Sequence, residues 1–528
     1  MTGEGTGAIV NRRQPIRWIA SRWTVLSLVG VSVGLVYWFM GTAGTMTRFP
    51  QTTKAFYDQL AVAFADGHFD LVQRPDATAS GEAALLDRYW DLSLYEGRLY
   101  LYWGPVPAVL GAVLLRVFGW HPADEVLTIL FAWLRAVIGI AVLARAKTLF
   151  FRGQPWWPTV LGGCVLVIGG PMSFLLTRAA VYEVAIMGAQ CFLLAGVAFV
   201  FWAMHPPGRE ARARALFVAA GSSWALALGC RVSQLPACAA LCVLACAGDA
   251  LPRSRGKRLR VLAIDAALLV SPIAAGLAAL ALYNRARFGS LFETGLRYQL
   301  DTAPFRIAPE FATLNVSTYA LKPPVAGGAF PFLRVAPWDG FWLWRLFPEL
   351  SLDRAEIWRD RNVGLLWSTP FYGLSLVTVL VLGKWLVRAA KQRDERIVGG
   401  SMLLSWLCAS SLAMTVLGIL PCLLGNASTP RYPMDAATGL ALASTLGLSF
   451  LLAVPRRSPL ARGALITFAT SLAALSIVVN AALWVDGGTN DFLATENPRL
   501  YGRLSMLFSA RAGGSLPPAM GPARATPR

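Results

Sequence analysis

Charged residues are scarce in this sequence of 528 residues. Asp, Glu, Lys and Arg make up only 15% of the chain, whereas 56% of the residues are hydrophobic. Soluble domains carry about 25% charged residues, so the composition excludes an ordinary soluble protein. Apolar runs of about 20 residues recur, which is the length that a helix needs to cross the hydrocarbon core of a membrane. The sequence therefore predicts an all-α polytopic membrane protein.

Histidine is rarer still, and cysteine shows no ligand pattern. His68, His121 and His205 lie far apart and lack the spacing of a zinc site. Three of the eight cysteines recur every four residues from Cys238, but no histidine or carboxylate joins them. Small polarizable side chains at a helix–helix contact explain them better. No metal site and no cofactor is predicted, although a divalent metal that accompanies the substrate stays open.

Three further patterns are absent. The chain has no glycine-rich phosphate loop, so no nucleotide site is predicted. It shows no internal repeat, which disfavours a transporter, because transporters are often built from repeats with broken helices. The N-terminal apolar run is too long for a cleaved signal peptide and lacks a clear cleavage site, so we expect an anchor helix.

The basic residues point to a membrane rather than to nucleic acid. The net charge is +19, but the Lys and Arg residues form short clusters between apolar runs, which is how membrane topology is encoded. Arginines before the first run place residues 1–21 in the cytoplasm. If the short apolar segment 105–118 crossed the membrane, all the later basic clusters would fall outside. We therefore expect that segment to lie on the membrane surface.

The predicted topology has about 11 transmembrane helices, with the N-terminus inside and the C-terminus outside. Residues 45–124 form a large first periplasmic loop with two interfacial helices, one around Phe56 to Phe64 and one at 105–118. The spans lie near 22–44, 125–147, 157–177, 183–204, 215–230, 233–249, 261–283, 363–383, 398–420, 435–454 and 463–485.

Four further regions follow from these spans. Residues 22–283 are the transmembrane core, 284–362 a periplasmic loop rich in Trp and Pro, and 363–485 the C-terminal helices. Residues 486–528 are a periplasmic tail whose Gly/Pro/Ala/Arg-rich end we expect to be disordered. The localisation predicted is the bacterial cytoplasmic (inner) membrane.

Polar residues that are costly at membrane depth gather at the predicted outer helix ends, which indicates a wet pocket on that side. Asp91 and Asp58 are alternative general bases that could take a proton from an acceptor hydroxyl, and Glu183 is a further acid. The expected substrate-binding residues are Arg178, Tyr182, Tyr102, Asn284, Arg287, Glu293, Arg431 and Tyr432.

Each candidate also has a plainer explanation. The rings around Tyr102 suit an interfacial collar, and Asp58 suits a solvated helix face. Arg178 and Glu183 suit a structural ion pair at a helix end, and the stretch from Asn284 to Glu293 suits a capped helix exit. Arg135, buried within a predicted span, is a functional candidate or an arginine that snorkels outward.

The motifs resemble those of the GT-C superfamily of membrane glycosyltransferases, near the protein O-mannosyltransferase and aminoarabinose-transferase type. The matching stretches are LYWGPVPAVLGAVLLRVFG (101–119), YE (182–183), YNRARFGSLFETG (283–295), GLLWSTP (364–370) and RYPMD (431–435). The family's essential Asp-Glu pair in the first loop corresponds here to Thr52 and Thr53. The resemblance implies that Asp58 or Asp91 replaces it, or that activity has changed, and that Glu183 matches the second-loop acid.

What the resemblance implies is sugar transfer from a polyprenyl-phosphate carrier to an envelope glycan, lipid or protein at the periplasmic face. Membrane lipid and the lipid-linked donor are the expected partners, and nucleic acid is not. The alternative from another class is a polytopic transporter or lipid flippase of the cell envelope. A non-catalytic membrane scaffold is a third reading, because the Asp-Glu pair is missing.

Overall fold

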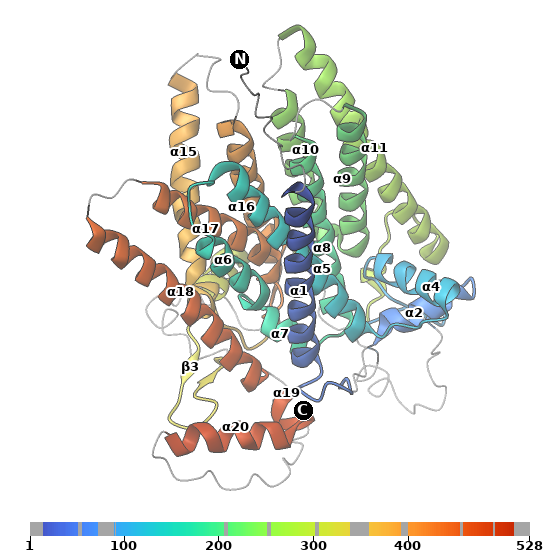
Figure 1. Ribbon diagram of the computed structural model, residues 1–528. Helices are drawn as coiled ribbons and strands as arrows, with labels where there is room; N and C mark the ends of the chain where they lie inside the picture. Colours follow the sequence, from blue (N-terminus) through green and yellow to red (C-terminus); the bar gives the residue numbers. More distant parts are fainter. Residues whose placement is uncertain are drawn as a thin grey trace, which may run out of the picture.

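Long helices run side by side along one axis in the computed structural model (Figure 1). The structure describes residues 14–50, 55–71, 89, 91–204, 210–250, 255–300, 306–337, 358–391, 400–454, 458–488 and 491–511. Within these ranges, ten helices are long and apolar enough to cross a membrane. Strands form only three short two-stranded pairs there. The predicted all-α polytopic architecture is confirmed.

The first part of the chain builds most of the bundle and a collar beside it. Its elements are α1 (Gln14–Gly41), α2 (Phe56–Ala65), β1 (Ser93–Tyr95), β2 (Arg98–Tyr100), α4 (Val106–Phe118), α5 (Asp124–Phe150), α6 (Trp157–Ile168), α7 (Met172–Thr177), α8 (Val181–Ala203), α9 (Glu210–Cys230), η1 (Val232–Gln234), α10 (Leu235–Ala250) and α11 (Arg255–Phe288).

The second part completes the bundle and covers one of its ends. Its elements are η2 (Leu296–Tyr298), α12 (Glu310–Leu321), β3 (Val325–Ala326), β4 (Leu333–Arg334), β5 (Trp358–Arg359), α14 (Leu365–Ser368), η5 (Pro370–Leu374), α15 (Ser375–Lys391), α16 (Gly400–Leu423), β6 (Ala427–Ser428), α17 (Met434–Ala453), α18 (Pro459–Asp486), α19 (Phe492–Glu496) and α20 (Pro498–Arg511).

We call the lower end of the bundle in Figure 1 the site end. There α1 ends and α19 and α20 lie (Figure 1). Because successive long helices reverse direction, α5, α8 and α17 begin at this end. Groups of described Lys and Arg residues lie at the opposite end, at the end of α5 and α15 and at the start of α9 and α11.

The ten candidate spans match ten of the eleven predicted ones, with shifted boundaries. The span predicted at 363–383 runs instead from Pro370 to Arg388 and follows the short helix α14. Helix α1 occupies the place of the eleventh, and the apolar part recognised within it is Ser27–Gly41. The bundle is therefore built from the segments that hydropathy predicted.

The two helices predicted for the first loop, α2 and α4, pack on each other and lie across the bundle (Figure 1). Helix α2 begins after Ala55, whose side chain cannot accept a hydrogen bond. The carboxylate of Asp124, the first residue of α5, takes that role. It accepts the backbone N–H groups of Tyr57 at 3.2 Å and Asp58 at 2.8 Å. A long-range N-cap thus fastens the collar to the bundle.

The span predicted at 157–177 is not one helix. Helix α6 ends at Ile168, Gly170 has a φ of +70°, and α7 begins after Pro171. The break frees carbonyl groups inside the bundle, where each needs a donor. Arg135, 1% exposed, donates to the Leu166 carbonyl at 2.9 Å. The hydroxyl of Tyr37 donates to the Val167 carbonyl at 2.8 Å. Arg135 therefore points inward and does not snorkel.

The region predicted as a tail contains two helices, α19 and α20. The amide of Asn497, between them, donates to the carbonyl of Ala43 at 2.9 Å, just beyond the end of α1. The indole of Trp484 donates to the Met40 carbonyl at 3.2 Å. The chain therefore contacts the end of α1 at Asn497, and α20 continues as a helix to Arg511. The disorder predicted beyond that point lies outside the described residues.

Replacing Arg135 with Met should destabilise the fold. The Leu166 carbonyl would lose its donor inside the bundle, which costs about 1–3 kcal/mol. Thermal unfolding of the purified protein in detergent should show a lower Tm. Arg212→Met, at an exposed position of α9, is the matched control and should leave the Tm unchanged. Equal Tm values for the two variants would contradict the assigned role of Arg135.

Candidate active site

The segment before α4 folds as a hairpin at the site end. Strands β1 and β2 pair antiparallel, with Tyr95 opposite Arg98. Glu96 and Gly97 both have positive φ angles, +49° and +73°, as a tight two-residue hairpin turn requires. The hydroxyl of Ser93 donates to the Gly295 carbonyl at 2.7 Å, which docks the hairpin on the chain after α11. The hairpin holds the preceding residue, Asp91, in place.

Asp91 is fully buried and lies beside two tyrosines from different parts of the chain. The hydroxyl of Tyr182, at the start of α8, donates to Oδ1 of Asp91. The hydroxyl of Tyr102 lies 3.5 Å from that of Tyr182. Burial, and then the negative charge of Asp91, raise the pKa of Tyr102, so its phenol keeps its proton and remains a donor. Sequence positions 91, 102 and 182 therefore converge as predicted for a site.

Arg431 brings positive charge to the same place. Its guanidinium stacks over the ring of Tyr182, 4.0 Å from the ring centre, and lies 5.7 Å from that of Tyr432. It is only 6% exposed, and it makes no ion pair within the described ranges. A buried guanidinium held by aromatic faces keeps its charge for an anionic ligand. Arg431 thus stands beside the Asp91–Tyr182 pair.

Glu183 follows Tyr182 in α8 and bonds to different partners. Its Oε2 accepts the backbone N–H of Ala180 at 3.4 Å, which caps the start of α8. Its Oε1 is buried and has no hydrogen-bond partner among the described residues. The charges of Arg178, which is half-buried, and of Arg431 act on this carboxylate. The free oxygen leaves Glu183 able to accept a bond from a ligand hydroxyl.

A buried ion pair lies next to the site and joins two segments that surround it. Arg231, just before η1, lies 2.7 Å from Asp435, near the start of α17, and donates to Sγ of Cys422 at 3.2 Å. Its guanidinium lies over the rings of Tyr432, at 5.1 Å, and Trp103, at 5.8 Å. The pair thus connects the turn after α9 with α17. Its arginine also packs on the aromatic rings of Trp103, before α4, and Tyr432, before α17.

Three other predicted residues, Asn284, Arg287 and Glu293, form bonds at the end of α11 and in the chain that follows it. Arg287, 4% exposed, donates to the Leu101 carbonyl at 2.6 Å and to Oδ1 of Asn284 at 2.8 Å. Glu293 accepts the backbone N–H of Gly295 at 2.8 Å. The bond from Arg287 to Leu101, just after β2, ties the hairpin to the end of α11.

Asp58 belongs to a different cluster, on α2. Its backbone carbonyl lies 3.1 Å from Nε2 of His121, and its backbone N–H donates to Asp124. Burial raises the pKa of the Asp58 carboxyl. Its bonds join α2 to Asp124 and His121. Thr52 and Thr53, at the positions that the resemblance matches to the family's Asp-Glu pair, lie outside the described residues.

Sequence reasoning missed two parts of this arrangement. It treated the stretch after Asp91 as a run of interfacial aromatics, although the Glu-Gly pair between alternating apolar residues is a hairpin signal. It also did not identify Asp124. This residue is an acid at the start of a predicted span, and the helix that it caps begins after an alanine that cannot act as a cap. Among the described residues, no group of three or more His, Cys, Asp or Glu side chains could hold a metal ion.

No protein-family model and no curated protein matches the sequence. The fold is similar to the archaeal oligosaccharyltransferase AglB from Archaeoglobus fulgidus, solved with an inhibitory peptide and a dolichol-phosphate. The TM-score is 0.46 at 12% identity, over 95% of this chain and 61% of that one. The chain therefore spans about three fifths of the length of AglB.

It is also similar to ArnT from Cupriavidus metallidurans bound to undecaprenyl phosphate, with a TM-score of 0.42 at 13% identity, over 93% of this chain and 80% of that one. The apo state of ArnT has a TM-score of 0.45 at 13% identity, over 90% and 78%. The likeness to these solved structures is one of fold alone.

The Arg231–Asp435 pair generates a stability prediction. Arg231→Met leaves the carboxylate of Asp435 buried without its counter-charge, which should cost about 3–5 kcal/mol. The double variant Arg231→Met/Asp435→Leu removes both charges and should recover a large part of that loss. Thermal unfolding in detergent measures both. The pairing would be contradicted if the double variant lost as much stability as Arg231→Met and Asp435→Leu lose when their separate losses are added.

Proposed function

We propose that this chain is a membrane glycosyltransferase that moves a sugar from a polyprenyl-phosphate-linked donor to an envelope acceptor. The single observation that carries the proposal is the juxtaposition of Asp91, Tyr182 and Arg431. A buried carboxylate, a phenol and an arginine without an ion pair within the described ranges meet at one end of a membrane bundle. This combination supplies a base at the hydroxyl of Tyr182 and a phosphate-binding cation over its ring.

Asp91 is the proposed general base. It takes the proton from the acceptor hydroxyl as that oxygen forms a bond to the anomeric carbon of the sugar. The bond from the anomeric carbon to the phosphate oxygen breaks, and its electron pair stays on the phosphate. Tyr182 orients the carboxylate through its hydrogen bond, and Glu183 accepts a bond from a substrate hydroxyl. In this scheme Asp58 is a structural residue of the collar.

Arg431 is the proposed partner of the departing lipid phosphate. Negative charge develops on that phosphate as the sugar leaves, and a fixed guanidinium at a dry site stabilises it strongly. The basic clusters at the opposite end of the bundle favour a cytoplasmic location for that end. We therefore place the site at the periplasmic face of the bacterial inner membrane, with the lipid tail between helices.

A transporter or lipid flippase is the less favoured alternative. The break between α6 and α7 is a feature of transporters, where the freed backbone groups bind substrate. Here Arg135 and Tyr37 occupy two of those groups. The titratable residues of the candidate site cluster at one end of the bundle and not at its midplane. The arrangement therefore supports chemistry at a surface better than passage through the membrane.

Asp91→Asn tests the proposal. The variant keeps an acceptor for the Tyr182 hydroxyl but cannot take a proton, so transfer should fall by about 10²–10⁴-fold. Purified protein in nanodiscs is assayed with a panel of undecaprenyl-phosphate-linked hexoses and pentoses and an envelope extract as acceptor. Loss of the sugar from the carrier is the readout.

Asp58→Asn is the matched control, because it removes a carboxylate from the same loop. Its transfer rate should stay close to that of the wild type, and its fold should be no less stable, since burial already disfavours the charged form. Full transfer by Asp91→Asn would sink the assignment of the base. Loss in Asp58→Asn alone would move that role to α2.

A further inference from the structure

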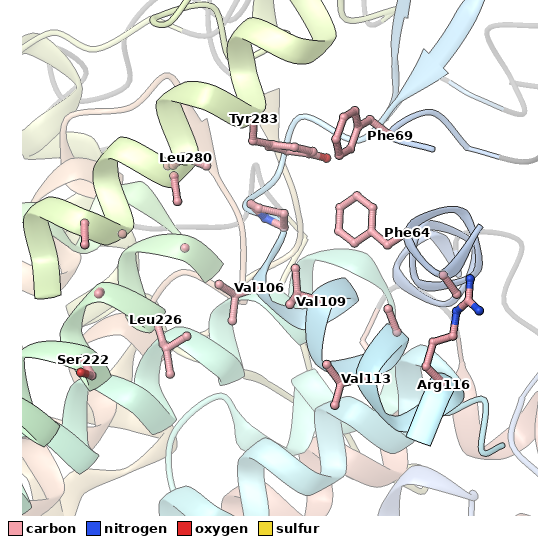
Figure 2. Close-up of a pocket in the computed structure, with 18 of the residues that line it drawn as sticks. Phe64, Phe69, Val106, Val109, Val113, Arg116, Ser222, Leu226, Leu280 and Tyr283 are labelled. Carbon is pink, nitrogen blue, oxygen red and sulfur yellow. The ribbon is translucent and has the colours of Figure 1, made fainter. Parts of the chain in front are cut away.

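A small polar pocket lies at the site end, apart from the large apolar groove beside α4, α9 and α11 (Figure 2). Its volume is about 40 Å³. Four segments meet there, namely the break between α6 and α7, the last turns of α18, the segment around α14, and the turn before α17. The walls of the groove are mainly hydrocarbon, whereas Asn362 and Asn480 line the small pocket. A pocket of this kind suits a small polar group.

Each of the two asparagines has one amide atom without a hydrogen-bond partner among the described residues. Asn362, 1% exposed, accepts the backbone N–H of Val363 through Oδ1 at 2.8 Å, so its Nδ2 is the atom left over. Asn480, also 1% exposed, donates from Nδ2 to the carbonyls of Ser368 at 2.7 Å and Ser476 at 2.8 Å, which leaves its Oδ1. Backbone partners therefore fix the orientation of both amides. The pocket offers one unused donor and one unused acceptor, and each costs about 1–3 kcal/mol while it stays unpaired.

A hydroxyl group satisfies both atoms, because its oxygen accepts a bond from Asn362 and its proton is donated to Asn480. None of the described residues that line the pocket is charged, so nothing there would balance an ammonium or a carboxylate group. Val363, Leu365 and Leu483 supply apolar walls that suit a carbon atom next to the hydroxyl.

The size of the pocket limits the group that enters it. One water molecule needs at least about 10–15 Å³ of cavity. A volume of about 40 Å³ therefore takes two or three atoms other than hydrogen. A hydroxymethyl group fits this space, whereas a whole sugar ring does not.

The pocket adjoins the segment of Arg431. Pro430 and Pro433, which line it, stand on either side of that arginine in the chain. Strands β5 and β6 pair in parallel, and they lead to Asn362 and to Arg431 respectively. Burial by itself would lower the pKa of Arg431, but the negative charge of Asp360, two residues before Asn362, is among those that raise it. In a lipid-linked donor the sugar is attached directly to the phosphate, so a phosphate bound to Arg431 holds the sugar close to this pocket.

We propose that this pocket receives the exocyclic hydroxymethyl group of the donor sugar, and that the donor therefore carries a neutral hexose. The proposal rests on the function proposed above, because it takes the phosphate of the carrier to lie at Arg431. The hydroxyl bonds to Asn362 and Asn480, and its carbon lies against the apolar walls. A pentose lacks this group and leaves both amides unpaired. The pocket thus selects the sugar, whereas Arg431 binds the phosphate that all such donors share.

Donor binding tests the pocket without any need for catalysis. The full chain in nanodiscs is given undecaprenyl-phosphate-linked sugars and no acceptor, so that the donor stays intact. Glucose is compared with xylose, mannose with lyxose, and galactose with arabinose, because each pentose is the hexose without its hydroxymethyl group. In the pair that binds best, the hexose should bind about 10–200-fold more tightly. Equal affinity within every pair would identify the pocket as a hydration site and overturn the proposal.

Filling the pocket is the matched test by mutation. Ser173, 2% exposed, lines the pocket, and Ser173→Leu adds as many atoms other than hydrogen as a hydroxymethyl group contains. Hexose binding should fall about tenfold or more and pentose binding should stay close to that of the wild type. Ser173→Ala removes the same hydroxyl without adding volume and should keep the hexose preference. A Ser173→Leu protein that unfolds at the wild-type Tm and keeps the full preference would refute the assignment.

A 6-deoxy hexose on the same carrier tests the hydrogen bonds, and it does so even if Ser173→Leu fails to fold. This sugar keeps the exocyclic carbon and lacks only the hydroxyl. The wild type should bind it at least about tenfold more weakly than the parent hexose, because both amide atoms lose their partner. In Asn362→Leu, which has no amide donor, the same deletion should weaken binding much less. An equal loss in the wild type and in Asn362→Leu would overturn the role of Asn362 and with it the proposal.

Transfer assays separate this inference from the function on which it rests. The wild type should transfer the hexose in preference to the matching pentose, and Ser173→Leu should lose that preference. Transfer of both sugars at equal rates would overturn the hexose pocket while the glycosyltransferase activity itself stood. Selective hexose binding without transfer to any acceptor would refute the glycosyltransferase and leave the recognition of the hexose in place.

Discussion

A carboxylate taken out of water has to be held by donors, and the site is built around this requirement for Asp91. The hydroxyl of Tyr182 supplies a donor, so the start of α8 has to lie against the first loop. The ring of Tyr182 in turn carries the guanidinium of Arg431 on its face. One charge therefore lies at the hydroxyl of this phenol and the other over its ring. A reaction that needs both a base and an anion-binding group gains from this spacing.

Buried hydrogen bonds and an ion pair hold the segments around Asp91, Tyr182 and Arg431 in place. Arg287 holds the backbone of the loop at Leu101, and Asp124 holds the first turn of α2. The Arg231–Asp435 pair fixes the far side, next to Tyr432. Each brace uses a charge that is buried and bonded, and this is the condition under which a buried charge specifies geometry. Precise positioning of the reacting groups depends on such support.

The sequence was informative wherever one physical effect dominates. Hydropathy predicted the long helices, and amphipathic spacing predicted α2 and α4, because burial from water decides both. It also brought Asp91, Tyr182 and Arg431 to the same end of the bundle through topology alone. It could not show which acid of the first loop lies against Tyr182. Asp58 and Asp91 are both acids in the same loop, and only long-range contacts distinguish them.

The dependence on contacts between distant parts of the chain also explains two other differences between the sequence analysis and the structure. The break at Gly170 depends on donors from Arg135 and Tyr37, which are distant in the chain, so no local pattern shows that a break is tolerated there. Arg287 looked like a ligand-binding arginine because its partner, the Leu101 carbonyl, is a backbone atom without any sequence signature. A buried arginine is a strong sign that something needs a donor. Whether that is a substrate or the protein's own backbone is a question of three-dimensional structure.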